Sequence, residues 1–452
     1  MAQITQQKGA ASSNPSGLKR WFLSTLMTHA ISDARLVRQR ARAEANRKKE
    51  GRRHVVEYFH QVDDGYSHLA IQALEKLTAT YDIDLVVHLV PALRDDNMPE
   101  PELLHEMSRW DSAGIAPYFG LAFPAGANLP ARALSDLALS VLGAMGTDAF
   151  VTAGAAVSDC LWRGDEAGLK ALAAQHGAVS SATVATKLEA GAARRTKLKH
   201  YSGAMFYYEG EWYWGVDRLS HLERRLRSLQ ALRNASANPA LPRPGIATTF
   251  PSGASDMTLE FYASLRSPYT SIAWEPTLAL AKASGIKLEV RPILPMVMRG
   301  VPATFQKAFY VWKDVSREAR DLGVDYGTFF DPVGNPVKQG LSLYMWALGK
   351  GRGNDVYGAF LKAAFAKGIN TNSSAGMRKV VEAAGLDWAE AQSHLEDNTW
   401  QDVVEANRKR MYDLGIWGVP SYRLLDKNGK QVLSVWGQDR LWLVSQKIVE
   451  HA

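Results

Sequence analysis

A serine and a proline, Ser267 and Pro268, mark the point where an apolar, strand-like segment of the sequence meets a helical one. Serine is favoured as the residue that caps a helix and proline as the first residue within it, so a helix is expected to begin at Pro268. Free backbone N–H groups and the helix dipole attract an anion at such a junction. The residue types therefore predict either an anion-binding site at Ser267 or a plain helix cap that contributes about 1 kcal/mol and no chemistry.

An earlier segment of the chain has the same pattern. Residues 57–69 keep the aromatic strand and the tyrosine after it, but Asp64 and Gly65 replace the serine and proline. Around both segments the apolar residues indicate a strand, a helix, a strand, a long helical insertion, two more strands and a final helix. The chain is therefore expected to be α/β, with two thioredoxin-like domains that each contain a small mixed sheet and a helical insertion.

The boundaries of these parts follow from composition. Residues 233–256 are rich in proline, alanine and serine and lack apolar periodicity, which is typical of a linker. The expected strands are residues 55–59, 83–91, 204–208 and 211–214 in the first half and 259–265, 287–293, 421–425 and 431–435 in the second. The expected parts are a disordered segment 1–16, a basic helical arm 17–53, a first domain 54–232, the linker 233–256 and a second domain 257–452.

Composition and charge exclude several classes of protein. The first 53 residues hold twelve lysines and arginines against three acidic residues, a net charge of +9, whereas the remainder of the +7 chain sums to −2. Neither domain is basic, so no nucleic-acid channel is expected across the body of the protein. The arm is expected to be a solvent-facing helix, and contact of the arm with nucleic acid or anionic lipid is the alternative. No apolar run is long enough to span a membrane. The single cysteine, Cys160, excludes an internal disulfide and a CxxC redox pair, so the chain is not expected to be a dithiol–disulfide oxidoreductase. A single cysteine also fits a cytoplasmic protein.

Four motifs in the second half carry a resemblance to a known family. The motifs are Ser267-Pro268-Tyr269 after a strand, then Lys307-x2-Tyr310-x3-Asp314-x2-Arg317-x-Ala319-x3-Gly323, then Gly418-Val419-Pro420, then Trp436-Gly437-x-Asp439-Arg440-Leu441. With these motifs in this order, the second domain resembles the 2-hydroxychromene-2-carboxylate isomerase and kappa-class glutathione transferase branch of the DsbA-like thioredoxin fold. The first domain keeps the last motif at residues 214–219 and has Gly203-Ala204-Met205 in place of the third.

The resemblance implies a glutathione-dependent isomerase or transferase that acts on a small conjugated or aromatic substrate. It places Ser267 beside the thiol of bound glutathione, where the helix start and the hydroxyl would favour the thiolate. It assigns the backbone of Val419, before a cis-Pro420, to the extended tripeptide. Asp439 and Arg440 would then hold the γ-glutamyl end, which carries an amine and a carboxylate.

Other interpretations of the same residues stay open. Pro420 also suits a turn that serves the fold alone, and Asp439 with Arg440 also suits an ion pair at a helix start. The loop at residues 298–302 lacks the asparagine of the family, and Asp64 would place a carboxylate where a thiolate should lie. We therefore expect a catalytically silent first domain, a chain that acts as a monomeric pseudo-dimer, and, as the alternative function, a non-catalytic tandem scaffold for a peptide or protein partner.

Overall fold

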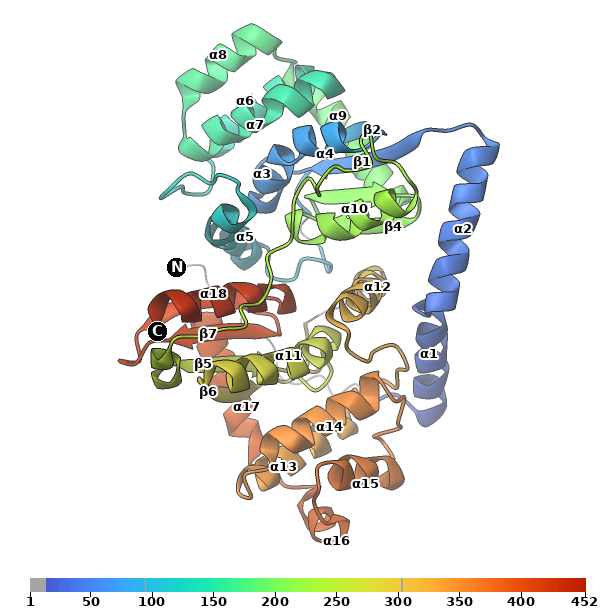
Figure 1. Ribbon diagram of the computed structural model, residues 1–452, viewed down its shortest axis with the longest axis vertical. Helices are drawn as coiled ribbons and strands as arrows, with labels where there is room; N and C mark the ends of the chain where they lie inside the picture. Colours follow the sequence, from blue (N-terminus) through green and yellow to red (C-terminus); the bar gives the residue numbers. More distant parts are fainter. Residues whose placement is uncertain (1–13, 94, 302–303) are drawn as a thin grey trace. The chain divides into compact units, whose positions relative to one another are not determined.

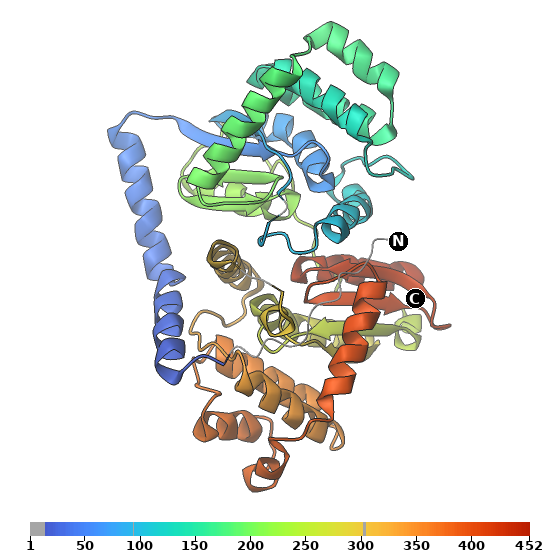
Figure 2. The same cartoon turned by 180° about the vertical axis from the view of Figure 1, so that it is seen from behind.

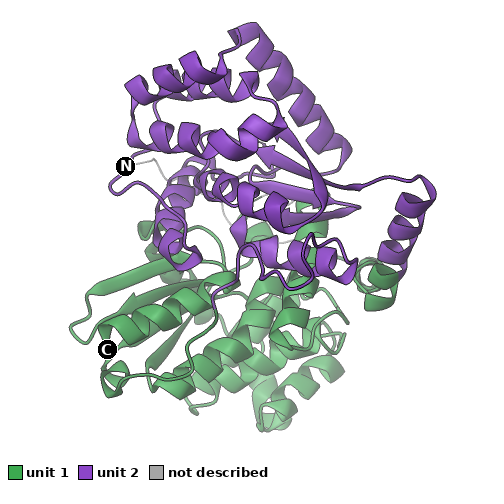
Figure 3. Ribbon diagram, turned by 45° about the horizontal axis from the view of Figure 1, so that its top comes forward, with its two compact units in different colours: residues 1–37, 245–452 green, residues 38–244 purple. Residues whose placement is uncertain are grey.

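The computed structural model describes residues 14–93, 95–301 and 304–452. The chain divides into two compact units (Figure 3): residues 38–244 form one, and residues 1–37 together with 245–452 form the other. The segment 1–16, expected to be disordered, lies outside the described residues except for positions 14–16. No helix in the described part of the chain is long and apolar enough to cross a membrane.

The unit formed by residues 38–244 is built around a four-stranded sheet of order β2-β1-β3-β4 (Figure 1). β1 pairs with β2 in parallel and with β3 antiparallel, and β3 pairs with β4 antiparallel. Its elements are β1 His54–His60, α3 Gly65–Gln72, α4 Leu74–Thr80, β2 Ile83–Leu89, α5 Pro101–Ile115, η1 Ala116–Phe119, α6 Arg132–Ala144, α7 Thr147–Arg163, α8 Glu166–His176, α9 Ser181–Lys197, β3 Met205–Tyr208, β4 Glu211–Trp214, η2 Val216–Arg218 and α10 Leu219–Ser228.

The other unit contains a second four-stranded sheet, of order β6-β5-β7-β8, with the same pattern of parallel and antiparallel pairs. The prediction of an α/β chain with two small mixed sheets and helical insertions is confirmed. The elements after the linker are η3 Ser252–Asp256, β5 Thr258–Ala263, α11 Pro268–Ser284, β6 Lys287–Pro292, η4 Met296–Arg299, α12 Phe305–Leu322, α13 Asn335–Leu348, α14 Gly353–Phe365, α15 Ser374–Ala383, α16 Trp388–Ala391, η5 Gln392–His394, α17 Trp400–Asp413, β7 Ser421–Leu425, β8 Gln431–Trp436, η6 Gln438–Arg440 and α18 Leu441–His451.

Helices cover both faces of this second sheet. α11 and α18 contact each other and lie in front of the sheet in Figure 1, whereas α17 packs against β6 and lies in front when the molecule is seen from behind (Figure 2). The core beneath α11 is aromatic: the rings of Phe261 and Tyr422 stack at 5.0 Å, and Trp274 stacks on Tyr357 at 4.7 Å. Burial of these large rings fixes the position of α11 on the sheet.

The expectation that the basic arm faces solvent holds for only part of it. It forms two helices, α1 Gly17–Ala30 and α2 Asp33–Lys49, and the boundary between the two units falls within α2. α2 has no buried residue, as expected for a solvent-facing helix, but α1 packs on the unit that contains the second sheet. Arg20, Ser24 and Met27 of α1 are buried there. Polar contacts of Arg20 and Ser24 with a distant loop, described below, explain this burial, which the local sequence does not indicate.

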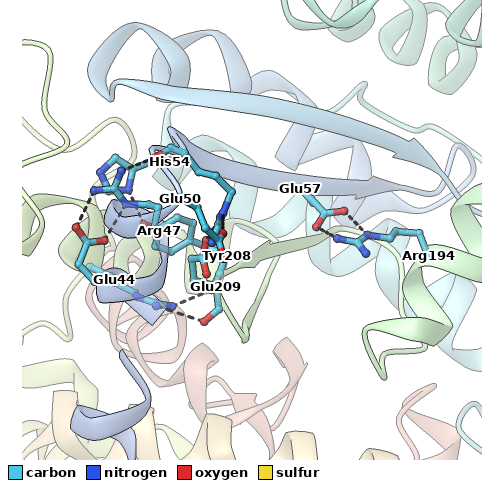
Figure 4. A network of polar contacts seen from close by, with 10 residues as sticks. Glu44, Arg47, Glu50, His54, Glu57, Arg194, Tyr208 and Glu209 are labelled. Atoms are coloured by element: carbon cyan, nitrogen blue, oxygen red, sulfur yellow. Dashed lines mark hydrogen bonds and ion pairs between the residues drawn. The ribbon is translucent and has the colours of Figure 1, made fainter. Parts of the chain in front are cut away.

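The first sheet has a buried carboxylate in its central strand. Glu57 of β1 is 7% exposed. Arg194 of α9 holds both of its oxygens through two hydrogen bonds of 2.8 and 2.6 Å (Figure 4), and His88 Nε2 of β2 lies 2.8 Å from Oε2. Burial by itself would raise the pKa of Glu57, but the hydrogen bonds and charges of Arg194 and His88 outweigh it and lower this pKa to about 2.

We expect Glu57 to make the unit formed by residues 38–244 sensitive to acid. Because its pKa is lower when folded than the value of about 4.3 expected when unfolded, the carboxylate stabilises the fold above that value and loses its contribution as the pH falls toward 2. In urea denaturation from about pH 7 to pH 3, Glu57→Gln should lower the stability by about 2 kcal/mol at neutral pH and flatten the loss on acidification.

The exposed Glu189 of α9 provides the matched control. Glu189→Gln should follow the wild-type pH profile. A Glu57→Gln profile as steep as that of the wild type would contradict this role for Glu57.

Candidate functional site

Ser267 lies at the start of α11, directly after β5, and is 8% exposed. Its backbone is extended and its Oγ accepts a hydrogen bond of 3.1 Å from the N–H of Thr270, so the residue is a helix cap. The same Oγ donates to the carbonyl oxygen of Val419 at 3.4 Å. The hydroxyl therefore connects the start of α11 to a segment more than 150 residues later in the chain.

The Val419–Pro420 peptide bond is cis, as the resemblance implies. It directly precedes β7, and the carbonyl of Pro420 accepts a hydrogen bond of 2.9 Å from the N–H of Gly437. Gly418 allows this segment to approach Trp436, since a Cβ at position 418 would lie 2.5 Å from the indole Nε1. A glycine is therefore required next to the cis bond.

Asp439 and Arg440 follow Gly437 in η6, which contacts α11. Arg440 is 3% exposed at its side chain and Asp439 is 13% exposed; Arg440 Nη1 lies 3.9 Å from Asp439 Oδ1. The neighbouring Gln438 donates to Glu318 of α12 at 2.7 Å, which holds η6 against that helix. The structure thus brings the predicted site residues into one region, while their roles in binding stay predictions. These residues are Ser267, Val419, Pro420, Asp439 and Arg440.

Aromatic rings and a cation lie beside the cis bond. The rings of Trp417 and Trp436 are 5.2 Å apart, and Nζ of Lys307 lies 5.2 Å from the ring of Trp417. A cation at this distance from an indole ring interacts favourably with its electron-rich face. Lys307, quoted above as part of the second motif, is therefore near the third motif in space.

The other residues of the second motif contact α11. Tyr269 Oη donates to Asp314 Oδ2 of α12 at 2.7 Å, and Arg317 Nη1 lies 3.6 Å from Asp314 Oδ1. Asp314 and Arg317 therefore pair with each other along one face of α12. The bond from Tyr269 adds a link between α12 and the first turn of α11.

Sequence reasoning missed Arg299. This residue of η4 is buried, and its guanidinium donates to the carbonyls of Leu294 at 3.0 Å and Trp417 at 3.4 Å. It lies in the loop that lacks the expected asparagine, and it connects that loop to the segment before the cis bond. Pro302, at the end of the same loop, lies outside the described residues. In the sequence, the one indication that Arg299 is buried and bonded to distant carbonyls is its position as a single charged residue among apolar ones.

A second missed group supports the residue before Ser267. Arg266 forms two hydrogen bonds of 2.8 and 2.9 Å with the carboxylate of Asp331. Burial would raise the pKa of Asp331, but Arg266 more than offsets it and lowers this pKa. Arg20 of α1 donates to the carbonyls of Asp331 and Val333, the latter at 2.8 Å. The N-terminal helix therefore supports the loop that holds Arg266.

The corresponding junction of the first sheet is different. Asp64 caps α3 by accepting hydrogen bonds from the N–H groups of Tyr66 at 3.4 Å and Ser67 at 3.0 Å, and burial raises its pKa to about 6. A Cβ at Gly65 would lie 2.4 Å from the carbonyl oxygen of Ser108 of α5. α5 is thus packed directly on the start of α3, which explains why glycine replaces proline here.

The single cysteine, Cys160, lies half-buried on α7 of the same unit, and burial raises its pKa.

Comparison with known proteins identifies the fold around Ser267. Residues 258–449 match the DSBA-like thioredoxin domain family and therefore form a DsbA-like thioredoxin domain. No protein of curated function matches the sequence significantly.

Several solved structures are similar to the chain. A probable DsbA oxidoreductase from Streptomyces coelicolor is 21% identical over 43% of this chain and 89% of its own, with a TM-score of 0.35. A 2-hydroxychromene-2-carboxylate isomerase is 18% identical over 42% of this chain and 93% of its own, with a TM-score of 0.35. The cytosolic disulfide reductase DsbM from Pseudomonas aeruginosa is 16% identical over 42% and 95%, with a TM-score of 0.29.

The capping role of Ser267 leads to a prediction about stability. Ser267→Ala should lower the free energy of unfolding of its unit by about 1 kcal/mol, because the N–H of Thr270 loses its acceptor. Ser267→Asn should stay within about 0.5 kcal/mol of the wild type, since asparagine caps helices as well as serine does. Urea denaturation measures both; equal losses for the two variants would contradict the capping role.

Proposed function

We propose that the DsbA-like domain of this chain is a glutathione-dependent isomerase or transferase that acts on a small conjugated or aromatic substrate. The observation that carries the proposal is the position of the Ser267 hydroxyl, between the start of α11 and the carbonyl of the cis Val419–Pro420 bond. The domain contains no cysteine, because Cys160 lies on α7 of the other unit. A thiol that reacts at Ser267 would therefore come from a bound molecule.

The groups around Ser267 fit such a molecule. The hydrogen bond from Ser267 to Val419 is long at 3.4 Å, so its hydroxyl can turn to donate to an anion at little expense. The start of α11 favours negative charge at the same point. When bound, glutathione supplies a thiol that adds to an electrophilic carbon of the substrate, reversibly in an isomerase and permanently in a transferase.

Asp439 and Arg440 provide the charges that would distinguish this tripeptide from a simple thiol. Both side chains are largely shielded from water, which strengthens a charge-assisted hydrogen bond to a ligand. A carboxylate beside a guanidinium matches a group that carries both an ammonium and a carboxylate. Trp417 and Trp436 add aromatic surface that suits a flat, apolar substrate.

We infer that the unit formed by residues 38–244 is a second, catalytically silent copy of the same domain. Two sets of matching contacts support this. Tyr66 donates to Asp111 at 2.8 Å as Tyr269 does to Asp314 at 2.7 Å, and each pair is 45 residues apart. The central strand of each sheet also buries a glutamate, Glu57 or Glu260, that pairs with a residue of the neighbouring parallel strand.

We expect this copy to lack catalytic activity because of two residues at the start of α3, Asp64 and Gly65. The carboxylate of Asp64 is a like charge for a thiolate and disfavours its formation. The approach of α5 to Gly65 leaves no room there for a side chain. A chain with one active and one silent copy would act as a pseudo-dimer; sedimentation that gives an obligate dimer of the full chain would count against this.

One observation favours the alternative, a non-catalytic scaffold that binds a peptide or protein. The Ser267 hydroxyl already has an acceptor and a donor within the protein, Val419 and Thr270. A residue that serves only as a cap and a link between segments would have the same contacts. Binding of glutathione separates the two functions.

The test is titration calorimetry of the full chain with glutathione. We expect saturable binding that Asp439→Ala weakens by about 2 kcal/mol, roughly thirtyfold, through the loss of a charge-assisted contact. Asp413→Ala, which removes an exposed aspartate at the end of α17, should bind as the wild type does. Absence of binding at about millimolar glutathione would contradict the enzyme proposal and favour the scaffold.

A further inference from the structure

α1 is packed with its polar face toward the protein. The Oγ of Ser24 accepts a hydrogen bond of 3.0 Å from the N–H of Asp331, and Oγ1 of Thr28 accepts one of 3.0 Å from the N–H of Phe329. The guanidinium of Arg20 reaches two carbonyls of the same loop. A helix on a protein surface ordinarily buries its apolar side and exposes its polar side. Met27 is the one large apolar side chain of α1 that is buried, so the orientation of this helix is largely inverted.

The apolar residues of α1 are consequently in solvent. Large apolar side chains with exposed fractions of 37% or more gather on this helix: Leu18 77%, Trp21 56%, Phe22 59%, Leu23 37% and Leu26 46%. Leu18, Phe22 and Leu26 follow each other at intervals of four residues and therefore form one stripe along the helix. A patch of this kind indicates a surface that binds a partner.

The charge around the patch indicates the partner. The chain has no aspartate or glutamate before Asp33, and the lysine within α1, Lys19, is exposed. The segment 1–53 as a whole, of which α1 is part, carries a net charge of +9. Apolar side chains with a tryptophan, next to cationic residues and without acidic ones, are the composition of a helix that lies in the interface of an anionic membrane.

We propose that α1 binds the surface of an anionic lipid membrane through Leu18, Trp21, Phe22 and Leu26. The helix lies parallel to the membrane, and its polar face keeps the contacts with the loop at residues 329–333. A second copy of the chain is a poorer partner for this face, because it offers the same exposed Lys19 and no acidic side chain before Asp33 to pair with it. The proposal does not depend on the function of the DsbA-like domain.

The test is flotation of the full chain with vesicles of phosphatidylcholine that contain about one third phosphatidylglycerol, compared with phosphatidylcholine alone. The wild type should float with the anionic vesicles, at least about tenfold more than with the neutral ones, and less at high salt. The double variant Trp21→Ser/Phe22→Ser should bind about tenfold or more weakly, since two large side chains no longer enter the lipid.

Leu348→Ser provides the matched control, because Leu348 is also exposed, at 45%, in the same unit but on α13. It should float as the wild type does. Leu18→Ser/Leu26→Ser gives an independent second variant, and a urea denaturation midpoint close to that of the wild type verifies that each variant is folded.

Three results would overturn the proposal. The first is a wild-type chain that does not float with anionic vesicles. The second is a folded Trp21→Ser/Phe22→Ser variant that floats as well as the wild type. The third is a wild-type dimer in sedimentation that this variant converts to a monomer while vesicles bind neither, which would assign the patch to a second copy of the chain.

Discussion

The carboxylate of Glu260 lies in the central strand of the second sheet and is 1% exposed. A buried charge without partners is strongly destabilising, so the surrounding elements must supply cations. Arg291 of β6, Arg410 of α17 and Arg423 of β7 do so, at 3.0, 2.6 and 3.5 Å. Burial would raise the pKa of Glu260, but the hydrogen bond from Arg410 and the nearby positive charges lower it.

This one group therefore connects the elements that carry the site. α17, which contains Arg410, is followed by the segment that holds Trp417 and the cis Val419–Pro420 bond. β5, which contains Glu260, is followed by the turn that ends at Ser267. The hydrogen bond from Ser267 to Val419 closes the connection at its other end. Glu260 and Ser267 thus lie at the two ends of one short segment. Ion pairs to β6, α17 and β7 hold its first end, and the bond to Val419 holds its second.

The two sheets illustrate how similar frameworks can present different surfaces. Both bury a central glutamate, and both hold the first turn of a helix with a tyrosine–aspartate hydrogen bond. They differ at the cap, where Asp64 and Gly65 occupy the positions that Ser267 and Pro268 occupy in the second. The junction in the first sheet therefore carries a carboxylate beneath a closely packed helix, whereas the junction in the second sheet carries a hydroxyl followed by a proline.

The sequence by itself determined the local features of this protein. A serine before a proline begins α11, residues 426–429 form the turn between β7 and β8, and the order of strands and helices gives two mixed sheets, because caps, turns and apolar periodicity depend on near neighbours.

Only the tertiary structure decided which distant groups meet. The contact of Ser267 with Val419, the burial of Arg299 against Trp417, and the largely inverted orientation of α1 join residues far apart in the chain. Such contacts are set by which segments neutralise a buried charge or satisfy a buried polar group, and those partners come from the whole fold rather than from the neighbouring sequence.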